Sequence, residues 1–172
     1  MDEKRLLKNI CKLTNKEIAK KYEFIGEGMC RKVYSINEDY VVKVAKIDGG
    51  RYQNLIENHV YTHANKDLLK YLCPILWFEP DRIIMKRAVP LSNLIKDQYI
   101  DLKTIRKEKE SYSDLSKLIK KFILDAEDII STSSWGILNN ENVLIDYGCT
   151  TYLGDVYYTI FHNLFLKNTH KK

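Results

Sequence analysis

Lys43 is the residue of this sequence whose surroundings most clearly suggest chemistry. It lies between Val42 and Val44, in an apolar, β-branched run that is typical of an inner strand. An ammonium group at such a position is costly to bury unless an anion pairs with it. Glu57, in the middle of the helical segment that we expect next, is a suitable partner. The two residues therefore predict a buried ion pair.

Glycines precede this pair, and an acidic motif follows it. Gly26 and Gly28 form a Gly-x-Gly turn between two strand-like segments, and Asp146 opens an Asp-Tyr-Gly triplet after a short hairpin pattern. A Gly-x-Gly alone is a weak signal, because glycine pairs are common at turns. Here the Gly-x-Gly comes just before the predicted hairpin whose second strand carries Lys43, and this position favours a functional role.

The apolar pattern predicts which elements hold these residues. A three- to four-residue apolar period predicts one amphipathic helix at the start and a long helix in the second half, with shorter helices between them, whereas alternation predicts strands. We expect Gly49 and Gly50 to break the chain before the helix that carries Glu57. The expected helices are residues 2–22, 53–64, 66–71, 91–95 and 114–130, with one more apolar helix near the end of the chain. The expected strands are residues 24–25, 32–36, 40–45, 76–78, 82–85, 137–138 and 143–145, and residues 103–110 are an exposed loop or helix end.

Composition and charge bear on the class of partner that the chain could bind. The net charge is +5, from 28 basic and 23 acidic residues that are spread along the chain, so nucleic-acid binding is not implied. Lysines recur every fourth residue from Lys4 to Lys20, which predicts a basic stripe on the first helix. We interpret this stripe as a solvated face; an acidic partner or a membrane surface is the alternative.

The cysteines and the apolar runs predict a cytoplasmic protein. The four cysteines lie far apart, without the spacing of a zinc site, and no secretory leader is visible. His59 and His63 are four residues apart, but neither a third ligand nor the glutamate of a zinc-protease motif accompanies them. The apolar runs, residues 156–166 included, are shorter than the roughly 20 residues that span a bilayer.

In these motifs and their order the sequence resembles the protein-kinase family, whose signature is a glycine-rich loop, a strand lysine, a helix glutamate and an Asp-Phe-Gly after a hairpin. The resemblance implies that Gly26 and Gly28 cover the nucleotide phosphates. It makes Lys43 the ligand of the α- and β-phosphates and Glu57 its ion-pair partner. It assigns Asp146 to catalysis, as the residue that holds Mg²⁺.

The resemblance also implies a fold. This is an α+β, protein-kinase-like fold in one domain, with a β-rich N-terminal lobe and a truncated helical C-terminal lobe. The expected division is an N-terminal helix at residues 1–21, the first lobe at 22–88 and the reduced second lobe at 89–172. Met85 lies in the link between the lobes, where the backbone meets an adenine ring in the family.

Departures from the family pattern bear on chemistry. Arg31 stands in place of the third glycine of the loop, which would either tighten phosphate binding or block it. The His-Arg-Asp catalytic loop is missing. Counting back from Asp146 places Asp128 at the position of the catalytic base and Ser133 at that of a metal-binding asparagine. A hairpin one residue shorter would place Ile129 and Ser134 there instead.

Two functions remain open on this basis. The missing catalytic loop and the short segment after Asp146 favour a pseudokinase that acts as a protein-binding or inhibitory module, similar to small proteins of phages or mobile elements acting in a host cytoplasm. The alternative is a weakly active ATP-dependent phosphotransferase with a small or protein substrate. The cofactors implied are ATP and Mg²⁺. We expect a protein partner, with the N-terminal helix as the contact element. We do not expect the chain to bind a membrane or a nucleic acid.

Overall fold

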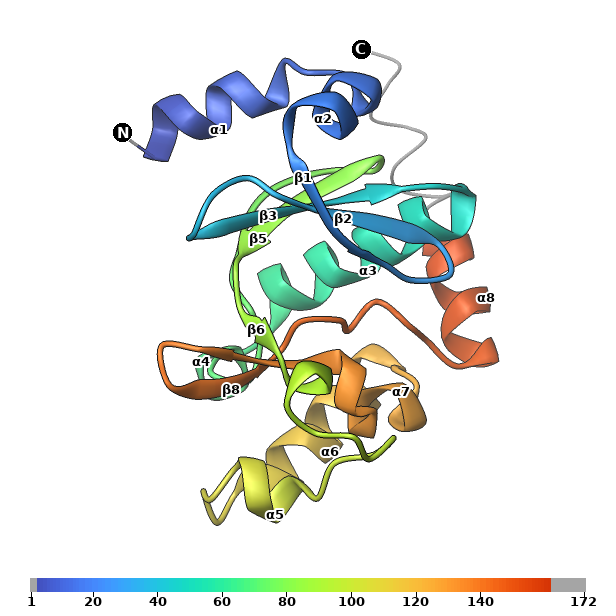
Figure 1. The fold of residues 1–172 in the computed structure, drawn as a ribbon. Coiled ribbons are helices and arrows are strands. Elements are labelled where there is room, and N and C mark those ends of the chain that lie inside the picture. The colour runs from blue at the N-terminus through green and yellow to red at the C-terminus, as the bar shows by residue number, and fades with distance from the viewer. Residues whose placement is uncertain (1–2, 162–172) are drawn as a thin grey trace.

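Two antiparallel sheets and the helices around them make up the described part of the chain, which is residues 3–161 of the computed structural model (Figure 1). The first half contains α1 (Glu3–Cys11), α2 (Asn15–Lys21), β1 (Glu23–Glu27), β2 (Arg31–Ser35), β3 (Tyr40–Ala45), α3 (Asp48–His63), α4 (Lys66–Leu69), β4 (Ile75–Glu79) and β5 (Arg82–Lys86). The second half contains β6 (Val89–Pro90), η1 (Leu91–Asn93), α5 (Leu102–Ile105), α6 (Ser111–Phe122), α7 (Ala126–Ile130), η2 (Thr132–Ser134), β7 (Trp135–Leu138), β8 (Glu141–Leu144) and α8 (Tyr152–Phe161). The predicted α+β class, with a β-rich first half and a helical second half, is confirmed.

The larger sheet has the strand order β1-β2-β3-β5-β4, and all of its pairs are antiparallel. Side chains alternate between its two faces. On β3, Val42 and Val44 join a core beneath α1 and α2, whereas Val41 belongs to the main core on the side of α3. Lys43, between Val42 and Val44, therefore points toward α3.

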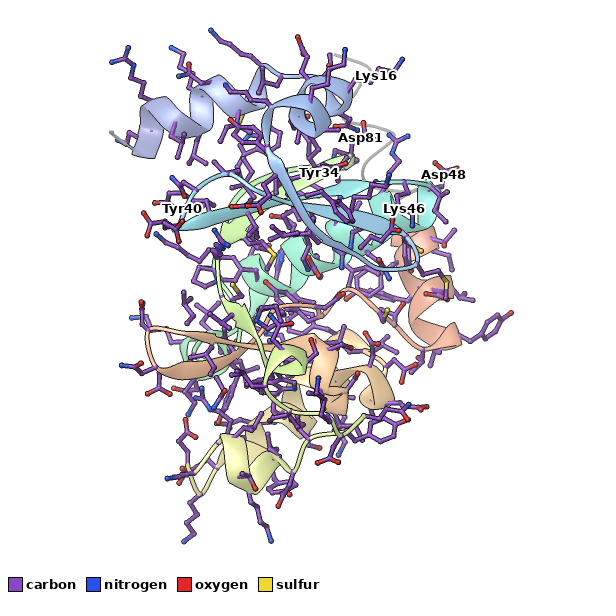
Figure 2. All side chains as sticks on the ribbon, in the orientation of Figure 1. Lys16, Tyr34, Tyr40, Lys46, Asp48 and Asp81 are labelled. Atoms are coloured by element: carbon purple, nitrogen blue, oxygen red, sulfur yellow. The ribbon has the colours of Figure 1, made fainter. Side chains whose placement is uncertain are left out.

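The N-terminal segment forms two helices, so the prediction of one continuous helix is wrong. Thr14 begins the second helix: its hydroxyl accepts a hydrogen bond from the Glu17 N–H at 3.2 Å, and the Thr14 N–H donates to the Glu17 carboxylate at 2.7 Å. This capping box stops α1 and restarts the chain as α2. Ile10 and Ile18 are fully buried against the sheet, and Figure 2 shows Lys16 on the outer side of α2.

The helix that carries Glu57 begins at Asp48, so the predicted break at Gly49 and Gly50 is wrong. Both glycines lie in the first turn of α3. A Cβ at Gly50 would lie 2.3 Å from the carbonyl oxygen of Cys30, which is closer than any real contact. Glycine at this position therefore lets the helix start pack directly against the chain that enters β2.

The second half is built on a three-stranded sheet of order β6-β7-β8. The predicted hairpin is present, and its turn residues Asn139 and Asn140 have φ angles of 51° and 66°. Two successive left-handed residues define the tight turn that fits the twist of a two-stranded hairpin, and asparagine adopts this conformation readily. The hairpin holds Asp146 just beyond the end of β8.

The long helix predicted for residues 114–130 is interrupted, and that prediction is wrong. Helix α6 ends at Phe122, Ile123 has a φ of 54°, and α7 begins after Asp125, whose carboxylate accepts a hydrogen bond from the Glu127 N–H. The apolar period continues through the break because Leu124 packs into the same core as the helical residues. Apolar spacing alone therefore does not mark where this helix ends.

Two of the other predicted helices are shorter than expected: the segment around residues 66–71 is the single turn α4, and residues 91–95 contain the 3₁₀ turn η1. The charged stretch 103–110, predicted as a loop or helix end, includes the end of the short α5. Between residues 3 and 161, no helix has the length and apolar character needed to cross a membrane. The end of the apolar stretch 156–166, beyond residue 161, lies outside the described residues.

Candidate functional site

The predicted ion pair between Lys43 and Glu57 is present at the centre of the molecule. Lys43 Nζ lies 2.8 Å from Glu57 Oε1 and donates a second hydrogen bond, of 2.5 Å, to the carbonyl oxygen of Ile145. Lys43 is 7% exposed and Glu57 is fully buried. The strand alternation of β3 directs the lysine inward, and the third turn of α3 presents the glutamate to it.

Arg31 also contacts this ion pair, and the sequence analysis did not predict this contact. Its Nη2 lies 2.9 Å from Glu57 Oε1 and 2.7 Å from Asp146 Oδ1, and its Nη1 donates to Asn54 Oδ1 at 3.1 Å. The side chain is 4% exposed, so it turns into the protein rather than toward the glycine turn. Burial alone lowers the pKa of the Arg31 guanidinium, but the charges of Glu57 and Asp146 outweigh this effect and raise it.

The sequence offered one signal for this contact. Asn54 and Glu57 are three residues apart on a helix, so their side chains share a face and can bind the two ends of one guanidinium. Nothing in the local sequence showed that Arg31 would be the group between them, because β2 and α3 meet only in the folded chain.

Asp146 completes the cluster from the other half of the molecule. Its side chain is 43% exposed, and it lies two residues beyond the end of β8. Burial raises the pKa of the Asp146 carboxyl, but the charges of Arg31 and Lys43 prevail and hold this pKa well below its usual range. The carboxylate is therefore ionised at neutral pH, and its negative charge lies in contact with the Arg31 guanidinium.

A cavity of about 520 Å³ opens beside the cluster, between the two sheets. Six of the residues predicted for the site line it: Gly26, Gly28, Lys43, Met85, Ser133 and Asp146. Its apolar lining includes Val33, Val41 and Ile145, and the linker after β5 forms one edge. Glu57 is buried behind Lys43 and is not among the lining residues. The structure thus brings the predicted glycine turn, strand lysine, linker and aspartate to one cleft.

Gly26 lies on β1 and Gly28 in the turn that follows, and both leave space rather than relieve backbone strain. A Cβ at Gly26 or at Gly28 would have no heavy atom within 4 Å. Neither residue has a positive φ. A side chain at either position would therefore be accepted by the fold and would project into free volume near the cavity.

Asp128 is not among the residues that line the cavity. It lies on α7 and is partly buried. Burial is the main cause that raises the pKa of the Asp128 carboxyl; a hydrogen bond with Cys149 opposes this shift, and the charge of Asp146 adds to it. In the alternative register, Ile129 and Ser134 are each 2% exposed and belong to the interior, whereas Ser133 is exposed at the cavity. The roles of Asp128 and Ser133 stay predictions.

The residues at Asp146 do not fit the Mg²⁺ that the kinase resemblance implies. One oxygen of the Asp146 carboxylate already carries Arg31 at 2.7 Å. The second expected ligand, Ser133, offers a hydroxyl, which is a poorer ligand for a hard cation than an amide carbonyl. Within residues 3–161, no group of three or more His, Cys, Asp or Glu side chains could hold a metal ion, and His59 and His63 stack on each other with ring centres 4.2 Å apart.

Comparisons with known proteins assign neither a family nor an activity to this chain. No family model matches the chain, and neither does any curated protein. Among solved structures, a ternary complex of streptomycin, ATP and APH(2")-IIa matches with 21% identity and a TM-score of 0.37. The match covers 77% of this chain and 43% of that one, so the chain spans less than half the length of that protein. At this level of similarity the likeness assigns no activity to this chain.

Proposed function

We propose that the cleft between the two sheets binds a purine nucleotide of the ATP class, and that the chain is a kinase-like module in which binding outweighs catalysis. The observation that carries this proposal is the convergence of Gly26, Gly28, Lys43, Met85 and Asp146 on one cavity of about 520 Å³. These residues come from different elements of the chain. The cavity is large enough for a small-molecule ligand and combines apolar walls with a few charged groups, as ligand sites do.

The apolar walls would hold the base. Val33, Val41 and Met85 extend from the larger sheet, and Ile145 faces them from the segment after β8. The backbone N–H groups of Lys86 and Arg87 are already bonded, to the carbonyl oxygens of Pro74 and Asp39. We therefore place the base edge against Ala88, the next residue of the linker that lines the cavity.

The phosphates would lie between Lys43 and the glycine turn. Lys43 is a cation fixed by Glu57 and by the Ile145 carbonyl, so it is held in place before a ligand arrives. Fixed charges of this kind bind an anion without the cost of ordering a flexible side chain. The open space at Gly26 and Gly28 lets the backbone approach the phosphate group closely.

The position of Asp128 supports binding over phosphoryl transfer. A general base must lie within hydrogen-bond reach of the proton it takes, and Asp128 is not among the cavity's lining residues. A weak phosphotransferase is the second candidate, because the charge of Asp146 contributes to the raised pKa of the Asp128 carboxyl. Transfer of labelled phosphate from ATP, to the chain itself or to a small acceptor, would favour this candidate, and its loss in Asp128→Asn would assign the base.

A protein partner is the remaining part of the proposal. On α8, a row of large apolar side chains is exposed, and these are Tyr152, Leu153, Val156, Tyr157 and Ile160. The inner faces of α1 and α2 are occupied by the sheet, so only their outer, lysine-rich side is available to a partner. Removal of residues 1–20 would therefore uncover the sheet core, and point substitutions on α8 are the better test of partner binding.

The nucleotide site is tested by calorimetric titration of ATP and ADP into the wild type and into Gly28→Val. The fold accepts the new side chain, which reduces the space next to the phosphates, so we expect affinity to fall by about tenfold or more with an unchanged unfolding midpoint. Met29→Val is the matched control, because Met29 is 89% exposed and does not line the cavity. Equal affinities in all three proteins, or no binding to the wild type, would refute the proposal.

A further inference from the structure

The buried cluster beside the cleft is balanced in charge. Arg31 and Lys43 supply two cations, and Glu57 and Asp146 supply two carboxylates, all joined by contacts of 2.7–2.9 Å. Without Arg31, Lys43 would face two carboxylates, and one negative charge would be uncompensated. A carboxylate of that kind attracts a divalent cation. With Arg31 present, the charge that would attract a metal is already neutralised.

Arg31 cannot readily leave this position. Its guanidinium is bonded on one side to Asn54 and Glu57 and on the other to Asp146. The side chain is 4% exposed, and Asn54 and Glu57 are fully buried. A guanidinium keeps its charge at all ordinary pH values and matches a carboxylate in geometry, so the contact with Asp146 is fixed in place.

The second metal ligand that the kinase resemblance implies, Ser133, is also a weak one. Ser133 lines the cavity, but its hydroxyl lies 2.8 Å from the Ser131 hydroxyl and shares a hydrogen bond with it. Mg²⁺ demands a near-octahedral set of oxygen ligands, of which carboxylates are the usual protein donors. Of the two ligands that the kinase resemblance implies, Asp146 is already paired with Arg31, and Ser133 is a neutral hydroxyl. The cavity is lined by a second carboxylate, Glu27, which is itself paired with Lys46 at 3.1 Å.

We propose that Arg31 takes the place of a divalent cation at Asp146, so that the cleft binds its nucleotide free of metal. The proposal rests on the nucleotide site described above and specifies the form of the ligand. Lys43 and the backbone of the glycine turn then contact the phosphates directly, and Asp146 serves to hold Arg31 rather than an ion.

The role of Arg31 can be tested without a nucleotide, by titrating Mn²⁺ and following its paramagnetic resonance signal. We expect no site at Asp146 in the wild type. Arg31→Gln should gain a Mn²⁺ site at least about tenfold tighter than any in the wild type, and Arg31→Gln with Asp146→Asn should lose it again. Circular dichroism checks that each variant is folded. Wild-type Mn²⁺ binding that Asp146→Asn abolishes would overturn the proposal.

Asp146→Asn alone provides a second measurement, because it leaves the buried arginine intact and changes a partly exposed side chain. In calorimetry, wild-type affinity for ADP in Mg²⁺ and in EDTA should agree within about threefold. Asp146→Asn should bind at least as well as the wild type, since Arg31 then has Glu57 as its one carboxylate partner and the negative charge of Asp146 is gone from the cleft. Mg²⁺-dependent tightening of about tenfold that disappears in Asp146→Asn would overturn the proposal. Absence of ADP binding under every condition would refute the nucleotide site, and the Mn²⁺ titration would still decide what Arg31 does.

Discussion

Replacement of Glu57 by glutamine tests whether the buried cluster holds the two halves of the chain together. Glu57 Oε1 receives hydrogen bonds from Arg31 at 2.9 Å, from Lys43 at 2.8 Å and from the Tyr147 N–H at 3.3 Å. Glutamine keeps the size of the side chain and removes its charge. Its amide oxygen can still accept a hydrogen bond. Arg31 would keep one carboxylate partner, Asp146, whereas Lys43 would have only neutral acceptors such as the Ile145 carbonyl.

The expected loss of stability follows from the two cations, Arg31 and Lys43, that stay buried in the variant. Removing one partner of a buried ion pair costs about 3–5 kcal/mol, because the other charge stays buried without compensation. Arg31 keeps its second carboxylate, so most of the cost arises at Lys43 and we expect about 3 kcal/mol. A domain of this size has a free energy of unfolding of about 5–15 kcal/mol in total, so the variant should still fold but with a much smaller free energy of unfolding.

Urea unfolding followed by circular dichroism measures this loss. We expect the midpoint of Glu57→Gln to fall by roughly 1–2 M, given a typical dependence of about 2 kcal/mol per M. Glu141→Gln is the matched control, because Glu141 makes a looser 3.6 Å contact with Arg106 and its side chain is 72% exposed. It should change stability by less than about 0.5 kcal/mol. A loss of less than about 1 kcal/mol for Glu57→Gln would refute the reasoning.

Three further predictions concern other positions. Gly148→Ala should destabilise the chain by about 2 kcal/mol or more in urea unfolding, because the new Cβ would lie 2.7 Å from the carbonyl oxygen of Gln53; an unchanged midpoint would contradict this. Asn140→Val should cost about 1–2 kcal/mol, since a β-branched residue is strained at a φ of 66°, and equal stability would show that the turn relaxes. Asp128→Asn should be more stable than the wild type above about pH 4, because folding raises the Asp128 pKa and the charged carboxylate is therefore disfavoured in the folded state. That difference should vanish at lower pH, where the carboxyl is protonated in both states, and a less stable variant at neutral pH would refute the assignment.

The sequence predicted the parts of the site that depend on local pattern. The apolar, β-branched neighbours of Lys43 indicated an inner strand, Glu57 lay in the middle of the helix expected next, and the asparagine-rich turn indicated a hairpin before Asp146. Each prediction needed only the composition of a single element and the rule that a buried cation requires a partner. The pairing of Lys43 with Glu57 is confirmed on that basis.

The position of Arg31 could not be predicted in this way. In the sequence it is an extra charge beside a glycine turn, and the two outcomes considered both assumed that it faces the phosphates. The structure turns it inward because Gly50 lets the start of α3 pack against the chain that enters β2, which brings Asn54 within 3.1 Å of the guanidinium. This contact depends on how two elements pack, and the pattern of neither element alone contains it.

The errors in helix boundaries have the same cause, because they too depend on packing and backbone conformation that the local pattern does not contain. Residues 114–130 keep an apolar period across the break, because Leu124 and Ile129 pack into the core that α6 also contacts. The break itself depends on the left-handed Ile123, a conformation that is rare for a β-branched residue. Local pattern gave no reason to expect it there.

The buried cluster also limits how the two halves of the chain can move. Arg31 lies on the larger sheet and Asp146 follows the smaller one, and Lys43 donates a hydrogen bond across the same boundary to the carbonyl of Ile145. Any opening of the cleft by rotation of one half against the other would have to break these contacts or carry them along. Enzymes that close over a substrate and reopen to release product need such motion in every cycle. A cleft held by its own ion pairs suits stable binding better than repeated turnover, which is a structural reason to favour the binding role independent of the position of Asp128.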